Sequence, residues 1–239
     1  MSVTPNERII VALDVPSRAQ ALKLVKTLDG ASFFKVGSQL FAETGPALLK
    51  ELIALEKRVF LDLKFHDIPN TVAGAVKSAR RWGVHLLTVH ASGGEAMLRA
   101  AREAAGDDGP RIFAVTLLTS LSSEDVERVF GRSPVSLVDE VVRLASLAVS
   151  AELAGVVASP AEVKPVKRRH GEALQVITPG IRLEGDDPAD QSRFATPEAA
   201  ARAGADFVVV GRSITAAKDP AAAFQAVARS LAAADAPRA

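Results

Sequence analysis

The chain has 239 residues, of which 24% are charged and 48% hydrophobic, and its formal net charge is +1. This near-neutral balance gives no indication of a nucleic-acid partner or of an acidic membrane surface. The sequence contains no cysteine, which excludes disulfides, thiolate metal sites and a cysteine nucleophile.

The hydropathy pattern predicts a single cytoplasmic domain. The chain contains no run of about 18 consecutive apolar residues, the length needed to span a membrane. Met1–Arg8 lacks the basic segment that begins a secretory signal. Single α/β barrels commonly have about 250 residues, and no Pro/Ser-rich linker divides the chain. We therefore expect one domain over residues 1–239, located in the cytoplasm.

Short apolar segments rich in β-branched residues alternate with segments of helical period along the chain. The expected strands are, in chain order, Arg8–Asp14, Phe33–Gly37, Arg58–Lys64, His85–Ala91, Arg111–Leu118, Gly155–Ser159, Leu174–Pro179 and Phe207–Gly211. The expected helices are Ser17–Leu28, Pro46–Glu56, Asn70–Trp82, Gly94–Ala105, Leu137–Leu153, Ala161–Arg169, Pro197–Ala203 and Pro220–Ala234. A short helical segment is also expected after the eighth strand.

This alternation predicts a parallel sheet covered by helices. The run Phe207–Val210 is apolar throughout, as expected for a strand that is buried on both faces. An open doubly wound sheet is the alternative to a closed barrel. Eight complete strand–helix units in order favour closure, so we predict an α/β fold with a single (β/α)8 TIM barrel.

Charged residues follow the ends of the first three predicted strands, where such barrels build their active sites. Asp14 ends the first strand, Lys35 lies in the second, and Asp62 and Lys64 end the third, with Asp67 in the next loop. Asp62 and Lys64 are two residues apart, so a strand directs both side chains to the same face. An ion pair that only fills the barrel is the alternative. Buried ion pairs stabilise poorly, and several buried charges are costly unless a ligand or reaction uses them, which favours a catalytic site.

A second polar group surrounds the last two predicted strands. Gly211 and Arg212 follow the eighth strand, and the loops after strands seven and eight commonly bind phosphate in such barrels. The backbone N–H of Gly211 can approach an anion closely, and the guanidinium of Arg212 can donate two hydrogen bonds to it. The long loop 180–196 carries Arg182 and Gln191 and is predicted to be a lid, with a flexible surface loop as the alternative.

The segment Phe60–Val72 resembles the Asp-x-Lys-x-x-Asp-Ile-Pro-Asn-Thr signature of the orotidine 5'-monophosphate decarboxylases. The resemblance continues, in chain order, through Ala12-Leu13-Asp14, Phe34-Lys35-Val36-Gly37, Val89-His90-Ala91, Thr178-Pro179-Gly180-Ile181-Arg182 and Val209-Val210-Gly211-Arg212-Ser213. It covers nearly the whole chain, with no departure at a motif position. Relatives carry Thr or Ser at the place of Thr119.

The resemblance implies a reaction without a cofactor or metal, the conversion of orotidine 5'-monophosphate to UMP and CO2 in the last step of UMP biosynthesis de novo. By resemblance, Lys64 gives a proton to C6 of the pyrimidine, and Asp62 faces the substrate carboxylate. Asp14 and Lys35 would hold the ribose hydroxyls, with Lys35 also part of the charged array. Loss of CO2 leaves a carbanion at C6, and an ammonium kept protonated by neighbouring carboxylates can stabilise that charge and deliver the proton.

The resemblance also implies residues that bind the rest of the substrate. Thr119 would contact the pyrimidine edge, and Pro179 would line the pocket for the base. The residues of the lid and of the phosphate-binding site would be Arg182, Gln191, Gly211 and Arg212.

A homodimer is the third implication. Asp67, Ile68 and Thr71 are expected to reach into the site of a partner subunit, with Asp67 completing the catalytic charges. Besides the substrate, the product and this second copy, no nucleic-acid partner and no membrane partner is expected.

Two alternatives stay open at this point. One is a metal-dependent sugar-phosphate decarboxylase or aldolase of the same barrel superfamily, which would share an Asp-x-Lys-x-x-Asp core but not the run from Asp67 to Thr71. The other is a catalytically silent barrel that binds a nucleotide. Sensitivity to a chelator separates the first from a metal-free enzyme, and a turnover assay separates the second.

Overall fold

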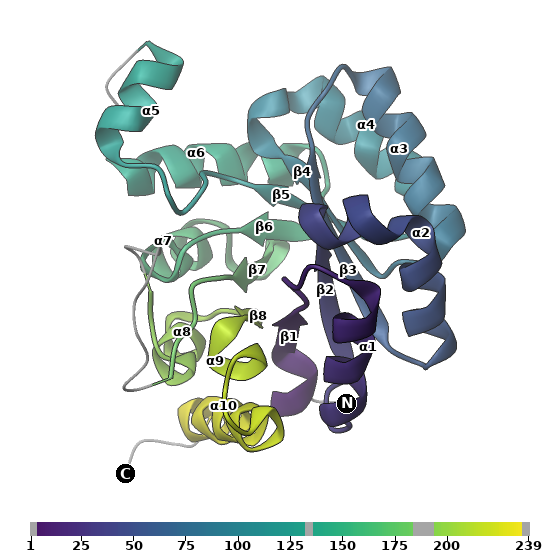
Figure 1. The fold of residues 1–239 in the computed structure, drawn as a ribbon. Coiled ribbons are helices and arrows are strands. Elements are labelled where there is room, and N and C mark those ends of the chain that lie inside the picture. Colours follow the sequence, from purple (N-terminus) through teal and green to yellow (C-terminus); the bar gives the residue numbers. More distant parts are fainter. Residues whose placement is uncertain (1–3, 132–135, 184–193, 236–239) are drawn as a thin grey trace.

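Eight parallel strands form a closed barrel in the computed structural model, which describes residues 4–131, 136–183 and 194–235 (Figure 1). The strands are β1 (Ile9–Ala12), β2 (Phe33–Gly37), β3 (Arg58–Phe65), β4 (Leu86–His90), β5 (Arg111–Val115), β6 (Gly155–Val157), β7 (Gln175–Thr178) and β8 (Phe207–Val210). Each strand pairs with the next one in the sequence, and β8 pairs with β1. The predicted (β/α)8 barrel is therefore confirmed, and the open sheet is excluded.

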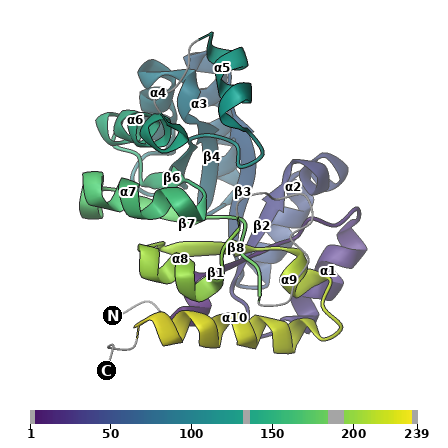
Figure 2. The same cartoon turned by 90° about the vertical axis from the view of Figure 1, so that its left-hand side faces the viewer.

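Helices surround the barrel (Figures 1 and 2). The α-helices are α1 (Arg18–Thr27), α2 (Ser38–Ala54), α3 (Pro69–Trp82), α4 (Glu95–Ala105), α5 (Ser123–Phe130), α6 (Leu137–Ser150), α7 (Pro160–His170), α8 (Pro197–Ala203), α9 (Arg212–Thr215) and α10 (Pro220–Asp235). Short 3-10 helices are η1 (Pro5–Arg8), η2 (Ala91–Gly93) and η3 (Gly171–Ala173). No helix in the described part of the chain is both long and apolar enough to cross a membrane.

Two expectations for the helices were wrong. The second helix begins at Ser38, eight residues before the expected start at Pro46, because the chain is helical on both sides of a kink at Gly45. The left-handed φ of 56° at Gly45 makes this kink, and Pro46 starts the second part. The helix α5 was not among the expected ones, although Ser122 and Asp125 form the capping box that starts it.

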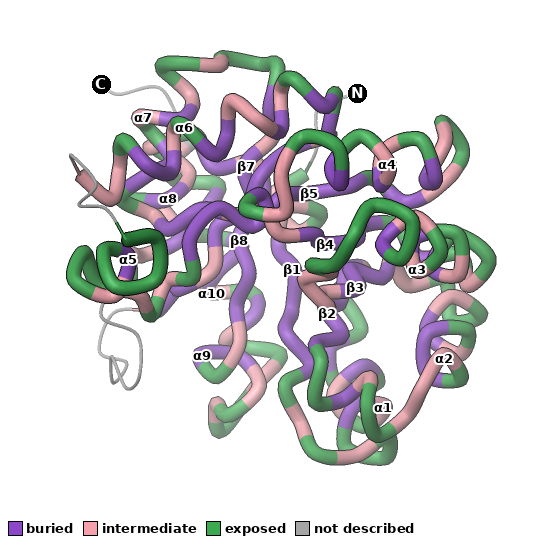
Figure 3. The backbone as a smooth tube through the Cα atoms, turned by 90° about the horizontal axis from the view of Figure 1, so that it is seen from above, coloured by how far each residue is buried: buried purple, intermediate pink, exposed green. Residues whose placement is uncertain are grey.

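The barrel interior has an apolar floor below a polar mouth. Nine buried residues fill the interior: Ile10, Ala12, Phe33, Phe60, Leu86, Phe113, Ile177, Phe207 and Val209. The other faces of the strands pack against the helices in a larger apolar layer, so the strands are buried on both sides (Figure 3). Because side chains alternate along a strand, the next inward position on β2 after Phe33 is Lys35, and on β3 after Phe60 it is Asp62. Charged side chains thus begin one layer above the apolar floor.

Candidate active site

The carboxyl ends of the strands surround a cavity of about 410 Å³, which is within the usual range for small-molecule sites. The predicted site residues that line it are Asp14, Lys35, Asp62, Lys64, Thr119, Pro179, Arg182, Gly211 and Arg212. The structure therefore brings together residues from both ends of the sequence. Apolar side chains of β5 and β6, Val115 and Val157, complete part of the wall.

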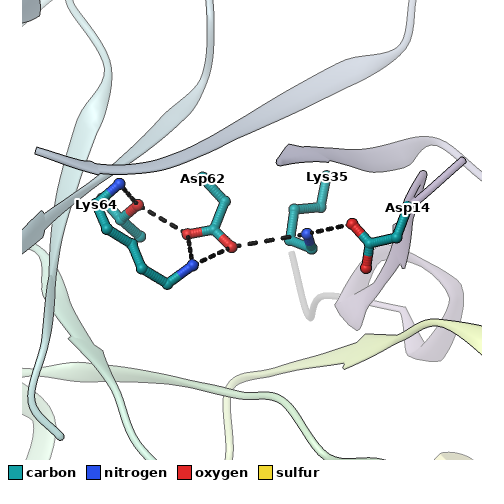
Figure 4. Close-up of polar contacts among 5 residues, drawn as sticks. Asp14, Lys35, Asp62 and Lys64 are labelled. Carbon is teal, nitrogen blue, oxygen red and sulfur yellow. Dashed lines mark hydrogen bonds and ion pairs between the residues drawn. The ribbon is translucent and has the colours of Figure 1, made fainter. Parts of the chain in front are cut away.

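Four side chains of alternating charge cross one side of this cavity (Figure 4). The Nζ atom of Lys64 lies 2.9 Å from both carboxylate oxygens of Asp62. The Nζ atom of Lys35 lies 3.7 Å from Oδ2 of Asp62 and 2.8 Å from Oδ1 of Asp14. We call Lys64, Asp62, Lys35 and Asp14 the charged array. Each cation in it has a carboxylate neighbour, which reduces the cost of holding like charges together.

The inner members of the array are shielded and the outer ones are open to solvent. The side chains of Lys35 and Asp62 are 10% and 12% exposed, whereas that of Lys64 is 36% exposed. Lys64 therefore remains accessible to a molecule in the cavity. The carboxylate that holds it is largely removed from water.

Asp62 is ionised in spite of its burial. Burial raises the pKa of a carboxyl group, but the charges of Lys35 and Lys64 and the hydrogen bonds from Lys64 and Thr88 outweigh this effect. The net result is a pKa of Asp62 below its ordinary value. The array thus keeps a fixed negative charge beside the ammonium of Lys64 at neutral pH.

The backbone of Lys64 adopts a left-handed conformation, with a φ of 50°. For residues other than glycine this region costs roughly 1–2 kcal/mol. The pairing of β3 with β4 shifts register between Leu61 and Phe65, so the strand bulges at this point. Strain of this kind persists where the surroundings enforce it and is common at functional sites.

Thr88 on β4 is a site residue that the sequence analysis missed. Its Oγ1 atom accepts the backbone N–H of Lys64 at 3.0 Å and donates to Oδ1 of Asp62 at 2.9 Å. The signal that could have found it is its position, two residues beyond the inward-facing Leu86 on the strand next to β3. A threonine in the apolar strand Leu86–His90 resembles an ordinary core residue, so no local pattern in the sequence marks it.

His90, at the end of β4, flanks the array on the side of the loop after β3. Its ring packs against that of His66, with 5.4 Å between the ring centroids. Burial, followed by the neighbouring His66 and Lys64, lowers the pKa of His90, and Asp62 opposes this only in part. His90 is therefore a neutral imidazole at neutral pH, and it adds no positive charge to the array.

A second group lines the cavity near β7 and β8. The side chain of Arg182 is buried, and its guanidinium donates to the carbonyl of Ile181 at 3.0 Å. Its backbone N–H donates to the carbonyl of Ala195 at 3.0 Å, which closes the base of the loop 180–196. Among the described residues Arg182 has no carboxylate partner, so a buried cation faces the cavity and can bind an anion.

Gly211 and Arg212 line the same cavity as this buried cation. Gly211 follows β8 and leads directly into α9, and both residues line the cavity. Gln191 lies outside the described residues, as does most of the predicted lid.

The residues expected to act across a dimer do not line the cavity of their own chain. Residues 66–71 form an exposed run around the start of α3, and Ile68 is 67% exposed. Oδ1 of Asp67 accepts the backbone N–H of Ile68 at 2.6 Å. In the part of the chain that the structure describes, no group of three or more His, Cys, Asp or Glu residues could hold a metal ion.

The chain is similar to known proteins over nearly its whole length. Residues 7–227 match the family described as "Orotidine 5'-phosphate decarboxylase / HUMPS family". The chain is 48% identical over 237 residues to the orotidine 5'-phosphate decarboxylase of Halorhodospira halophila, covering 98% of this chain and 100% of that protein. It is 44% identical over 229 residues to that of Gloeothece citriformis, covering 95% and 98% of the two chains. The crystal structure of orotidine 5'-phosphate decarboxylase from Lactobacillus acidophilus superimposes with a TM-score of 0.81 at 37% identity, covering 93% of this chain and 98% of that one.

Proposed function

Because the chain belongs to the orotidine 5'-phosphate decarboxylase / HUMPS family, we propose that its charged array carries out the decarboxylation of orotidine 5'-monophosphate with Lys64 as the proton donor. The activity is that of a carboxy-lyase, it yields UMP and CO2, and it belongs to pyrimidine biosynthesis. The whole activity is assigned to a single catalytic domain, located in the cytoplasm.

The observation that carries this mechanism is the ammonium of Lys64, held 2.9 Å from the carboxylate of Asp62 at the edge of the cavity. In the reaction the bond between C6 and the carboxylate carbon breaks, CO2 leaves, and the electron pair stays on C6. The Lys64 ammonium stabilises that pair and transfers one proton to C6. The amine then regains a proton from solvent, which its partial exposure allows.

Asp62 has two roles in this proposal. It holds the ammonium of Lys64 in position, and it faces the carboxylate of the bound substrate. Repulsion between the two carboxylates is relieved as CO2 departs. The side chains of the array hold one another in place, which is the property expected of a preorganised electrostatic field.

The remaining cavity residues are assigned to different parts of the substrate. Asp14 and Lys35 lie at the far end of the array from Lys64 and are assigned to the ribose hydroxyls. Thr119 and Pro179 are assigned to the pyrimidine.

We assign the phosphate to the group at β7 and β8, which consists of Arg182, Gly211 and Arg212, with Gln191 from the predicted lid. The buried guanidinium of Arg182 supports this assignment, because an anion would offset the cost of its burial. Binding energy from the phosphate, which is remote from the bond that breaks, can then support the chemistry at C6.

A homodimer completes the proposed site. Asp67, Ile68 and Thr71 are exposed in one chain, and a second copy would cover them and receive them at its own cavity. Asp67 would add a third carboxylate to the partner's array.

The test is the ultraviolet absorbance of orotidine 5'-monophosphate mixed with the purified protein in excess EDTA. We expect rapid loss of the substrate band, with UMP as the product. A protein that needs magnesium to act, or that turns over a sugar phosphate instead, would be a metal-dependent relative. One that binds UMP without any turnover would be a silent nucleotide-binding barrel.

A further inference from the structure

Thr88 contacts two members of the charged array but is itself fully buried, and it does not appear among the described residues that line the cavity. Whatever it does in the reaction must therefore pass through Asp62 and Lys64. Its single hydroxyl makes both contacts, at 2.9 Å to Oδ1 of Asp62 and 3.0 Å to the backbone nitrogen of Lys64.

The direction of these two hydrogen bonds is fixed by chemistry. The backbone N–H of Lys64 can only donate, so Oγ1 of Thr88 must accept it. The carboxylate of Asp62, which is ionised, can only accept, so the hydroxyl proton must point to it. The threonine thus has one orientation, and it links the backbone of one array residue to the side chain of another.

The hydrogen bonds of Thr88 lie at the bulge of β3, where the regular pairing with β4 does not hold the backbone. From Leu61 to Phe65 the chain of β3 takes four steps, whereas the paired residues of β4, Leu87 and Val89, are two steps apart. The extra length forms the bulge that contains Lys64 in its left-handed conformation. In the bulge the regular strand pairing is interrupted, and a side-chain hydroxyl from β4 binds the Lys64 N–H there.

We propose that Thr88 is a positioning residue for the decarboxylation, whose hydroxyl locks the bulged backbone of Lys64 to the carboxylate of Asp62 and so aims the ammonium at the substrate. This inference rests on the proposed roles of Lys64 and Asp62. The hydroxyl fixes both ends of the Lys64–Asp62 ion pair: the backbone from which the lysine extends, and the oxygen to which its Nζ is bound.

The test compares Thr88→Val with Thr88→Ser. Valine keeps the branched shape and removes the hydroxyl, whereas serine keeps the hydroxyl. We expect Thr88→Val to lower kcat by about 10- to 100-fold, the usual effect of removing a group that orients a catalytic residue. KM and the Kd of UMP should change by less than about threefold, because Thr88 hydrogen-bonds to Asp62 and Lys64 and not to the described groups assigned to the ribose, the base and the phosphate. Thr88→Ser should retain most of kcat.

Thr116→Val is the matched control. Thr116 is also buried, and its hydroxyl donates to the carbonyl of Val157 at 2.9 Å, a contact outside the array. This variant should lose stability but keep kcat. Thermal unfolding of all variants establishes that they are folded, and if Thr88→Val does not fold, Thr88→Ser and Thr88→Ala provide a pair that differs by the hydroxyl alone.

Three results would overturn the proposal: an unchanged kcat in folded Thr88→Val, an equal loss in Thr116→Val, or a serine variant as slow as the variant without a hydroxyl. Lys64→Ala is measured in parallel. If that variant keeps its activity, the proposed function fails; if it is inactive while Thr88→Val is fully active, only the role of Thr88 fails.

Discussion

At the scale of single residues, Asp62 organises the site. One carboxylate, 12% exposed, receives the ammonium groups of Lys64 and Lys35 and the hydroxyl of Thr88. A buried charge is expensive unless it is paired and hydrogen-bonded. Hydrogen bonds from Lys64 and Thr88, together with the ion pair to Lys35 at 3.7 Å, meet that requirement. The same contacts determine where the two lysines point, so a single acidic residue fixes the position of the proposed proton donor.

Lys64→Ala should abolish turnover while UMP still binds. The variant removes the group that stabilises the C6 carbanion and protonates it, so we expect kcat to fall by about 10³-fold or more. UMP lacks the carboxylate that would meet Asp62, so its Kd, measured by calorimetry, reports on the remaining site. The control is Lys57→Ala. Lys57 lies away from the cavity, and its side chain donates to the carbonyl of Ala31. Substantial activity in Lys64→Ala would remove that residue from its assigned role.

Arg212→Ala should impair catalysis although the phosphate is remote from the bond that breaks at C6. If Arg212 grips the phosphate, its loss should lower kcat/KM by about 10²-fold or more, because the anion loses a charged hydrogen-bond donor. Steady-state kinetics with the substrate measure the effect. Arg99→Ala, which changes an exposed arginine paired with Glu95 on α4, should leave kcat/KM unchanged. A near-native value for Arg212→Ala would contradict the phosphate assignment.

At the scale of elements, the strands do two different tasks. Most of them are short, apolar and buried on both faces, and they hold the barrel closed. The strand β3 differs, because its last residues leave regular pairing and present Asp62 and Lys64 to the cavity. Close packing of the regular strands provides the rigid base on which this irregular end can hold its shape.

Gly155 on β6 tests how close that packing is. A Cβ atom at this position would lie 2.2 Å from the carbonyl oxygen of Gln175 and 2.4 Å from the ring of Phe113. Because a backbone atom and a buried ring cannot yield easily, Gly155→Ala should lower the free energy of unfolding by about 1–3 kcal/mol. Urea unfolding measures this quantity.

Gly74→Ala is the control for that substitution. Gly74 lies inside α3, and its added Cβ would meet nothing within 4 Å. Alanine there should raise the free energy of unfolding by about 0.5–1 kcal/mol, because glycine is a poor helix former. Equal effects of the two substitutions would show that the packing around Gly155 on β6 is looser than these distances indicate.

At the scale of the whole molecule, the barrel holds the charged array at one rim and leaves a neighbouring segment uncovered. Residues 66–71 are exposed around the start of α3, and Ile68 is 67% exposed. A large apolar side chain in such a run is a natural contact for a second copy of the chain. The proposed dimer would therefore bury this segment and bring Asp67 to the other cavity.

Ile68→Glu should separate the proposed dimer. A charge buried without a partner costs about 3–5 kcal/mol, which weakens association by roughly 100-fold or more. Sedimentation measures the oligomeric state. Activity should decrease as the dimer dissociates, because Asp67 then leaves the partner's site. Leu55→Glu changes another exposed apolar residue, at the opposite end of the barrel before β3, and should alter neither property. A wild-type dimer in Ile68→Glu would contradict the assigned interface.

The sequence by itself determined the barrel, because a local pattern of apolar runs and helical periods repeats eight times and admits few topologies. It also determined most of the cavity, since strand ends in a parallel barrel meet at one rim, which brings Asp14, Lys35, Asp62 and Lys64 together. Only the tertiary structure decided the bulge of β3, the left-handed backbone of Lys64 and the role of Thr88 in holding both. These depend on how two strands are paired in register, and a contact between residues 24 positions apart in the chain leaves no local pattern to be read.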